Sequence, residues 1–465
     1  MRKEEIILIY TRPWFKDFYQ LLAVQIEQKF KCKVIFFSDY AMKNVHNISP
    51  FKRNLKEYNV SLQPEYFDII KRDRLLRTED WSKAIGILNA YEENITALFE
   101  RYTIKFLFSA TVDQFAIDMC YRQCIMKKIP FIGYHMSVVP GYTLLTARGE
   151  NNQFRIPDNN ELSLAIAAIE PKSFRPDYIP KKGKLRLTGL GRFCSNIARV
   201  PFFFFKDITE PRYNYHYKST FKSARSKTNF GMVKSIFGHR KKFNPDHDNS
   251  LDIYIPLQLH PECNSEYWNR DAAYKDYEDI IFEFCKRYAK YFKIGLKEHP
   301  NMVGMRDAEF YKKLLSLDVD LINVEEDNRK LIKKSTITVT YNSSVGIEGL
   351  IYGSQIFCIG NPLYLTKGHI LNEQDMVDTL QNQKQLNIAS DNNKRFLREA
   401  VGKILSMSIS GLLPDNARIK NDKQRLELQS IAISFASDLK KYFIDIVAQE
   451  KNLENIYTYK EQFHD

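Results

Sequence analysis

Short apolar runs alternate along this chain with longer stretches in which apolar residues recur every three or four positions. The short runs predict buried strands, and the longer stretches predict helices with one apolar face. In the first part of the chain we expect strands at 5–10, 33–37, 105–109 and 129–133, and helices at 15–30, 79–101, 112–127 and 161–170. This alternation is typical of an α/β protein with a parallel sheet.

A second α/β pattern begins at 252. It predicts strands at 252–255, 293–297, 319–324, 337–341 and 355–360, with helices at 271–291, 325–335 and 345–352 between them, and helices at 374–382, 393–410 and 423–448 after them. Residues 171–200 look irregular, and the polar turn at 244–250 marks a boundary. We therefore expect two Rossmann-like domains facing a cleft, with this division: 1–200, an acceptor domain; 201–250, a basic aromatic linker; 251–392, a nucleotide-sugar domain; 393–465, C-terminal helices.

Two polar turns follow strands of the second domain, at the sheet edge where α/β proteins bind ligands. Asn342, Ser343 and Ser344 precede an amphipathic helix, whose first N–H groups favour a phosphate. Pro300 fixes the turn that carries His299, and a histidine there can stabilise or protonate a leaving group. Alternatively, Ser343 is only a helix cap and His299 a satisfied turn residue.

Other candidates are less distinctive. Lys297 adds positive charge or lies on the surface, while Gln258 and His260 could bind substrate at the turn after 252–255. Glu262 could be a nucleophile or base facing a sugar, or a structural capping carboxylate. The first domain offers four weaker candidates for acceptor or sugar-carboxylate contacts: Arg12, Asp113, His135 and Arg148.

Metal and cofactor are not expected. Asp318 and Asp320 match a DxD pattern that binds metal–nucleotide complexes elsewhere, but here they precede a strand, at the wrong edge of the sheet. The seven cysteines include no CxxC pair, so neither a zinc site nor a disulfide framework is indicated.

The formal net charge is +13 and is unevenly distributed. Residues 211–243 contain nine Lys or Arg residues, interleaved with aromatic residues, and no acidic residue. This segment could bind anionic lipid headgroups, an acidic glycan or lipid-linked acceptor, or nucleic acid, or it could be a solvated linker. We favour a membrane surface and expect no nucleic acid, because no nucleic-acid motif accompanies the charge. No apolar run is long enough for a membrane span or a signal peptide, so we expect a cytoplasmic protein peripheral to the inner membrane face.

Three motifs, IYIPLQLHPE (253–262), LKEHP (296–300) and VTYNSSVGIEGLIYG (339–353), resemble the bacterial capsule polysaccharide synthesis family, which includes β-Kdo transferases. The HP and SS pairs are also similar to those of bacterial sialyltransferases. The resemblance implies the GT-B glycosyltransferase fold and a CMP-sugar donor, with CMP-Kdo favoured, and a glycan or glycolipid acceptor. It also implies that His299, Ser343 and Ser344 hold the donor phosphate. Glu348 could bind the ribose, or it could be a solvated helix residue. Relatives often carry Asp where this chain has Glu262. The alternatives are a sialyltransferase, another nucleotide-sugar transferase, or a non-catalytic scaffold of a polysaccharide assembly complex.

Overall fold

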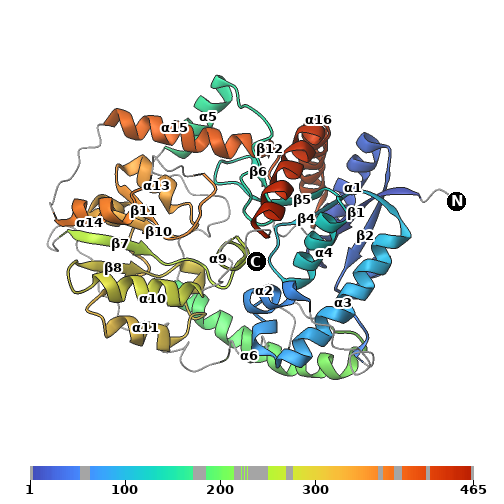
Figure 1. Ribbon diagram of the computed structural model, residues 1–465, viewed down its shortest axis with the longest axis horizontal. Coiled ribbons are helices and arrows are strands. Elements are labelled where there is room, and N and C mark those ends of the chain that lie inside the picture. Colours follow the sequence, from blue (N-terminus) through green and yellow to red (C-terminus); the bar gives the residue numbers. More distant parts are fainter. Residues whose placement is uncertain are drawn as a thin grey trace. The chain divides into compact units, whose positions relative to one another are not determined.

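The computed structural model describes residues 4–52, 63–170, 185–213, 250–268, 276–364, 370–381, 390–414 and 419–461, and the single positions 221, 225 and 228. The chain divides into two compact units (Figure 1). The first comprises Met1–Tyr178, Ile208–Tyr217 and Gly402–Asp465, and the second comprises Ile179–Asp207 and Lys218–Val401. Each unit contains one sheet, as the sequence predicts.

The first unit is built on a seven-stranded sheet of order β12-β6-β5-β4-β1-β2-β3. Strands β1 to β5 are parallel, and β6 and β12 are antiparallel additions. The strands are β1 (Glu5–Tyr10), β2 (Lys33–Ser38), β3 (His46–Asn47), β4 (Thr103–Ala110), β5 (Phe131–Met136), β6 (Tyr142–Leu145) and β12 (Ser408–Ser410). The parallel part, in order 3-2-1-4-5, is the Rossmann arrangement.

Helices cover this sheet because its strands alternate buried side chains between two faces. One face packs against α1 (Lys16–Phe30) and α16 (Asp422–Glu461), through Ile7, Ile9, Phe106 and Phe108. The unit also contains α2 (Pro64–Arg72), η2 (Leu76–Thr78), α3 (Trp81–Arg101), α4 (Phe115–Met126) and α5 (Asn159–Ile169). The long helices were predicted correctly, whereas β3, β6, β12 and α2 were not predicted.

The second unit is built on a five-stranded parallel sheet of order β11-β10-β7-β8-β9. Numbered from β7, this order is again 3-2-1-4-5 read from β9. The strands are β7 (Leu251–Pro256), β8 (Ile294–Lys297), β9 (Asp320–Ile322), β10 (Ser335–Thr340) and β11 (Gln355–Cys358). The predicted fold class, α/β with two Rossmann-like sheets as in GT-B proteins, is confirmed.

Two apolar clusters hold the helices of the second unit to opposite faces of its sheet. The larger cluster joins Ile253, Ile255 and Val339 to α10 (Tyr277–Tyr288), α11 (Ala308–Leu315) and α14 (Glu373–Gln381). The smaller joins Leu251 and Tyr254 to α12 (Asn328–Lys333) and α13 (Val345–Tyr352). Figure 1 shows α13 on the other side of this sheet from α10 and α11. The remaining elements are α9 (Cys263–Glu266), η3 (Pro300–Met302) and α15 (Ser390–Ser406).

The contacts between elements differ from the predicted domain boundaries. Residues predicted to be irregular form part of α6 (Leu185–Thr209), and this helix groups with the second unit as far as Asp207. Residues 402–465 group with the first unit, because β12 extends its sheet and α16 packs on its core. Most of the predicted linker, including the turn at 244–249, lies outside the described residues.

Candidate functional site

Three polar turns of the second unit meet at the carboxyl edge of its sheet. They follow β7, β8 and β10, and β7 pairs with both of the others. Since paired strands lie about 4.8 Å apart, the ends of β8 and β10 are separated by about 10 Å. The strand order reverses between β7 and β10, and ligands of doubly wound sheets bind at such a reversal. The sequence placed the turns after β8 and β10 at strand ends of one domain, and the strand pairing adds that β7 lies between them.

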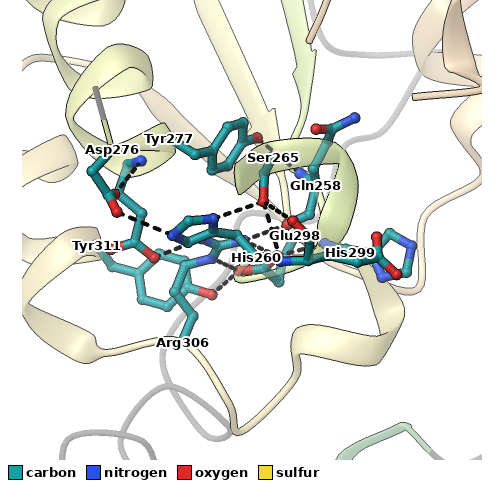
Figure 2. A network of polar contacts seen from close by, with 11 residues as sticks. Gln258, His260, Ser265, Asp276, Tyr277, Glu298, His299, Arg306 and Tyr311 are labelled. Atoms are coloured by element: carbon teal, nitrogen blue, oxygen red, sulfur yellow. Dashed lines mark hydrogen bonds and ion pairs between the residues drawn. The ribbon is translucent and has the colours of Figure 1, made fainter. Parts of the chain in front are cut away.

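Arg306 ties the turn after β7 to the turn after β8 (Figure 2). Its side chain is fully buried and donates to the Glu298 carboxylate (2.7 Å) and to the backbone oxygen of Gln258 (2.5 Å). It also pairs with Glu278 at 2.6 Å. Burial alone would lower the pKa of Arg306, but the Glu298 and Glu278 carboxylates raise it above its ordinary value. The guanidinium is therefore permanently charged and holds both turns in one geometry.

Glu298 is the second centre of this network. One carboxylate oxygen accepts from the backbone N–H of His299 (2.6 Å), and the other accepts from Arg306 and from the Tyr311 hydroxyl. Glu298 is 6% exposed. A buried carboxylate needs such partners, because an unpaired one would cost several kcal/mol. Glu298 therefore fixes the backbone that carries His299.

His299 presents one defined ring nitrogen. Its Nδ1 accepts the backbone N–H of Asn301 (3.1 Å), so this nitrogen carries no proton and Nε2 does. Burial, aided by the nearby Arg306, Lys297 and Arg192 cations, lowers the pKa of His299 to about 4, against an opposing effect of Glu298. At neutral pH the ring is therefore uncharged, and Nε2–H is a hydrogen-bond donor rather than a strong acid.

The Gln258 side chain bridges to the turn after β10. With its oxygen facing that turn, the amide accepts from the backbone N–H groups of Asn342 (3.0 Å) and Ser343 (2.7 Å). The opposite orientation would set the amide NH2 against two other donors. Gln258 is 3% exposed, and its backbone N–H donates to the Tyr277 hydroxyl (2.8 Å). A neutral oxygen thus occupies two of the N–H groups that the sequence assigned to a phosphate.

The remaining groups of the turn divide into structural and available ones. The Asn342 side chain donates to the Asn264 backbone oxygen (2.7 Å) and accepts from the Asn361 N–H (2.7 Å), so it is structural. The Ser343 hydroxyl accepts from the Val345 N–H (3.2 Å), as the helix-cap alternative proposed. The described part of the chain supplies no partner for the Ser344 hydroxyl, at the N-cap of α13. Ser344 is therefore the group of this turn most available to an anion.

Glu262 occupies the N-cap position of α9, and the Ser265 hydroxyl lies 3.2 Å from its N–H. This position is the one expected if Glu262 is a structural capping residue. The residue is only half-buried, however, so its carboxylate can also reach a substrate. His260 lies next to it in a buried row, with Nδ1 2.9 Å from Ser265 Oγ and Nε2 3.3 Å from Asp276 (Figure 2). Burial lowers the pKa of His260, against the effect of Asp276.

That row resembles a Ser-His-Asp triad in composition only. Ser265 is fully buried, and its hydroxyl is engaged with the Glu262 backbone. A nucleophile must reach its substrate, so the row can only orient the turn that carries Glu262.

Three further residues were predicted to contact the nucleotide-sugar donor, and they differ in burial and in their partners. Lys297 is buried, and its ammonium donates to Asn328 Oδ1, which also accepts from the Tyr254 hydroxyl (2.9 Å). Pro300 is the first residue of η3, as expected for the residue that fixes this turn. Glu348 is half-buried in the first turn of α13.

Sequence reasoning missed Arg306, Glu298 and Arg192. Arg192, from α6, donates to the backbone oxygen of Asn301 (2.8 Å) and so supports the turn of His299. Glu298 lies inside a motif that was identified, and its place directly before His299 was the available signal. Arg306 and Arg192 follow no motif, and only their spatial position shows their role.

The four weaker candidates of the first unit have different partners. Arg12 and Asp113 make a two-bond ion pair with each other at the ends of β1 and β4. Arg148 lies 3.3 Å from Asp118 and 3.7 Å from Asp68, within a second ion-pair group. His135 is half-buried, with Nδ1 2.9 Å from the Met136 backbone oxygen. The ion pairs favour a structural role for Arg12, Asp113 and Arg148.

The described residues lack both a metal-binding cluster and a membrane-spanning helix. These contain no group of three or more His, Cys, Asp or Glu side chains placed to hold a metal ion. Asp320 begins β9, so the DxD-like pair lies at the amino end of its strand, as expected. None of the described helices has the length and apolarity needed to cross a bilayer.

The fold and the site together define a protein of two Rossmann-like units with a candidate anion site at the β7/β10 reversal. Residues 205–397, which include all three motifs, match the family described as "Capsule polysaccharide biosynthesis protein". The predicted resemblance to that family is confirmed over this part of the chain. Among curated proteins, Protein FixF of Sinorhizobium fredii (strain NBRC 101917 / NGR234) is 23% identical over 165 residues, 34% of this chain. The match spans 38% of the length of that relative.

Solved structures give distant likenesses. The β-Kdo 2,7 transferase of Thermosulfurimonas dismutans KpsC is 12% identical, with a TM-score of 0.33, over 92% of this chain and 99% of that one. The β-Kdo 2,4 transferase of the same protein is 11% identical, with a TM-score of 0.35, over 92% and 98%. A UDP-GlcNAc 2-epimerase from Neisseria meningitidis is 12% identical, with a TM-score of 0.24, over 86% and 98%.

Proposed function

We propose that this protein is a metal-independent glycosyltransferase that uses a CMP-activated sugar, most simply CMP-Kdo. Its acceptor would be a lipid-linked or growing bacterial surface polysaccharide at the cytoplasmic face of the inner membrane. The observation that carries the proposal is the convergence of the three family motifs at the carboxyl ends of β7, β8 and β10. Uncharged donors and buried cations gather there, which suits a departing nucleotide phosphate.

The donor phosphate would bind between His299 and the N-terminus of α13. Neutral His299 donates through Nε2, and Ser344 contributes its hydroxyl and the positive end of the helix. Both bonds strengthen as the C–O bond to the sugar breaks and negative charge collects on CMP, so they lower the barrier. Glu298 and Glu278 balance the charge of Arg306, so the buried Lys297 is the cation that would add a favourable field without a metal ion.

Glu262 is the proposed carboxylate for the sugar. Kdo has a tertiary anomeric carbon, so its transfer passes through an oxocarbenium-like state. Glu262 would either bond to that carbon as CMP leaves, and be displaced by the acceptor hydroxyl, or remove the proton of that hydroxyl as it attacks. The turn held by Ser265, His260 and Asp276 orients it.

The test is a donor screen with EDTA present: CMP-Kdo, CMP-sialic acid and UDP-sugars are incubated with the full chain and a glycan extract, and products are detected by mass. Transfer from CMP-Kdo supports the proposal, and transfer from CMP-sialic acid supports the sialyltransferase alternative. Transfer from UDP-sugars alone contradicts the donor class.

A non-catalytic scaffold is the second candidate, and one observation favours it. The Gln258 oxygen already satisfies two N–H groups that a phosphate would use. CMP binding without turnover of any donor in the screen would support the scaffold.

A further inference from the structure

Helix α6 carries an exposed apolar ridge in addition to its packed face. Phe193 and Asn196 are buried, and Arg192 bonds to the turn of His299. Elsewhere on the helix, Leu190, Ile197 and Phe204 recur every seven residues and therefore share a side. Phe205 and Ile208 continue this side, so we define the apolar ridge as Leu190, Ile197, Phe204, Phe205 and Ile208.

The ridge is unusually exposed for such residues. Ile197 is 49% exposed, Phe205 64% and Ile208 66%, and Phe204 remains 45% exposed although its ring contacts Phe221 (5.4 Å between centroids). With a rise of 1.5 Å per residue, the ridge runs about 27 Å along the helix. Contiguous exposed apolar surface of this kind marks an interaction site.

Charge identifies the kind of partner. Arg199 is exposed on another side of α6, and Lys206, two turns further along that side, is half-buried. The sequence that follows, 211–243, contains nine cations and no acid. A basic helix with an apolar side is the pattern of interfacial membrane binding. A symmetric contact between two copies would bring the same basic sequence close to itself, which like charges oppose.

We propose that the apolar ridge of α6 inserts into the boundary between headgroups and acyl chains of an anionic bilayer. The inference deepens the proposed membrane location by naming the element that enters the lipid. It does not depend on sugar transfer. The cations would hold the protein at the surface, and the ridge would provide binding that salt does not remove.

The test uses the full chain and sedimentation with vesicles of phosphatidylcholine, with or without phosphatidylglycerol. We expect binding to the anionic vesicles that is weakened but retained in high salt. The double variant Ile197→Ser/Phe205→Ser should bind at least about tenfold more weakly, since burying one such side chain is worth about that factor. Leu164→Ser, at a 63% exposed site on α5, is the matched control and should bind like wild type.

A second variant reports insertion directly. Phe205→Trp should show a blue-shifted emission on vesicle addition, and brominated acyl chains should quench it, relative to the unsubstituted protein. Unchanged vesicle binding of the double variant, or binding that salt abolishes completely, would assign the contact to the basic sequence alone and overturn the inference. A wild-type dimer that the double variant dissociates, with no vesicle binding, would overturn it in favour of self-association. CMP binding is measured separately, so failure of the membrane inference can be distinguished from failure of the proposed donor site.

Discussion

The proton position on one ring determines what His299 can contribute. Because Nδ1 accepts from Asn301 and the pKa is about 4, the ring meets its ligand as a neutral donor through Nε2. The sequence alone left open whether this histidine stabilises or protonates the leaving group. The structure favours stabilisation, because a neutral imidazole is a poor acid.

His299→Asn separates the two ring nitrogens. The Asn oxygen can take the place of Nδ1 as the cap of η3, but nothing replaces the Nε2 donor. We expect a folded protein whose kcat falls about 10²–10³-fold, as for loss of one oxyanion donor. The measurement is donor turnover with melting temperature as the folding control, and near-normal turnover would remove this histidine from the mechanism.

The low pKa of His299 also predicts a pH dependence of stability. The unfolded histidine, with a pKa near 6.5, binds a proton before the folded one does. Stability is therefore fully present above about pH 6.5 and is lost as the pH falls towards 4. The loss is on the order of 2 kcal/mol after allowance for partial exposure. Between pH 7 and pH 5 the urea midpoint should therefore fall by more in wild type than in His299→Asn, and parallel pH dependences would contradict this.

Glu262 has two possible roles, and they predict different behaviour. Glu262→Asn keeps a good N-cap but removes the carboxylate. If the carboxylate acts on the sugar, this variant should melt normally, bind CMP and lose most transfer. Ordinary transfer would make Glu262 a capping residue only, and mass spectrometry of wild type with donor alone would then show no sugar adduct.

Buried polar side chains hold the turns after separate strands in one fixed arrangement. Arg306 joins the ends of β7 and β8, while the Gln258 amide joins the ends of β7 and β10. A buried ion-pair network of this kind fixes the geometry of the turns more than it adds net stability. Removing one partner, however, leaves the other buried charges uncompensated.

Arg306→Met should therefore destabilise the protein by about 3–5 kcal/mol, because the buried Glu298 is left without its cation. The double variant Arg306→Met/Glu298→Gln should recover part of that loss. The control is Arg287→Met, which removes an exposed pair with Glu373 and should change the free energy of unfolding far less, because water screens that pair. Equal costs of the two single variants, from urea unfolding, would contradict the assigned role of Arg306.

The pattern of apolar residues predicted correctly the helices and strands that bury one or both of their faces. The parallel strands and the helices α1, α3 and α10 have strong apolar periodicity, so their types were correct. Strand β12 has only Ile409 as its apolar residue, and its pairing with β6 depends on a partner more than 260 residues away. The part of helix α6 that was predicted to be irregular contains two glycines, Gly189 and Gly191, which weaken the helical pattern, and Pro201 follows directly after it.

The candidate site was predictable as far as motifs mark strand ends. His299, Ser343 and Gln258 were identified because polar turns follow apolar runs. Their partners were not, since Arg306 has no sequence pattern and contacts residues up to 48 positions away. Nor could sequence show that Gln258 occupies the N–H groups of Asn342 and Ser343.

Across the whole molecule, two sheets of the same strand order carry different polar groups at their order reversals. In the first unit, Arg12 and Asp113 neutralise each other at the ends of β1 and β4. In the second, the neutral donors His299 and Ser344 and the buried cation Lys297 lie at the ends of β8 and β10, on either side of β7. Only the second arrangement suits a phosphate, so the account assigns the donor to the second unit.

The most direct test of that claim is the CMP-dependent melting temperature of the full chain in EDTA, compared between wild type and Gln258→Glu. A carboxylate at 258 can still accept from the Asn342 and Ser343 N–H groups, but its charge repels a phosphate. We expect CMP to raise the melting temperature of wild type by mass action. Gln258→Glu should melt normally with little CMP shift, and the exposed-site variant Gln374→Glu should behave like wild type. An equal CMP shift in Gln258→Glu, or stabilisation of wild type only by UDP with manganese, would contradict it.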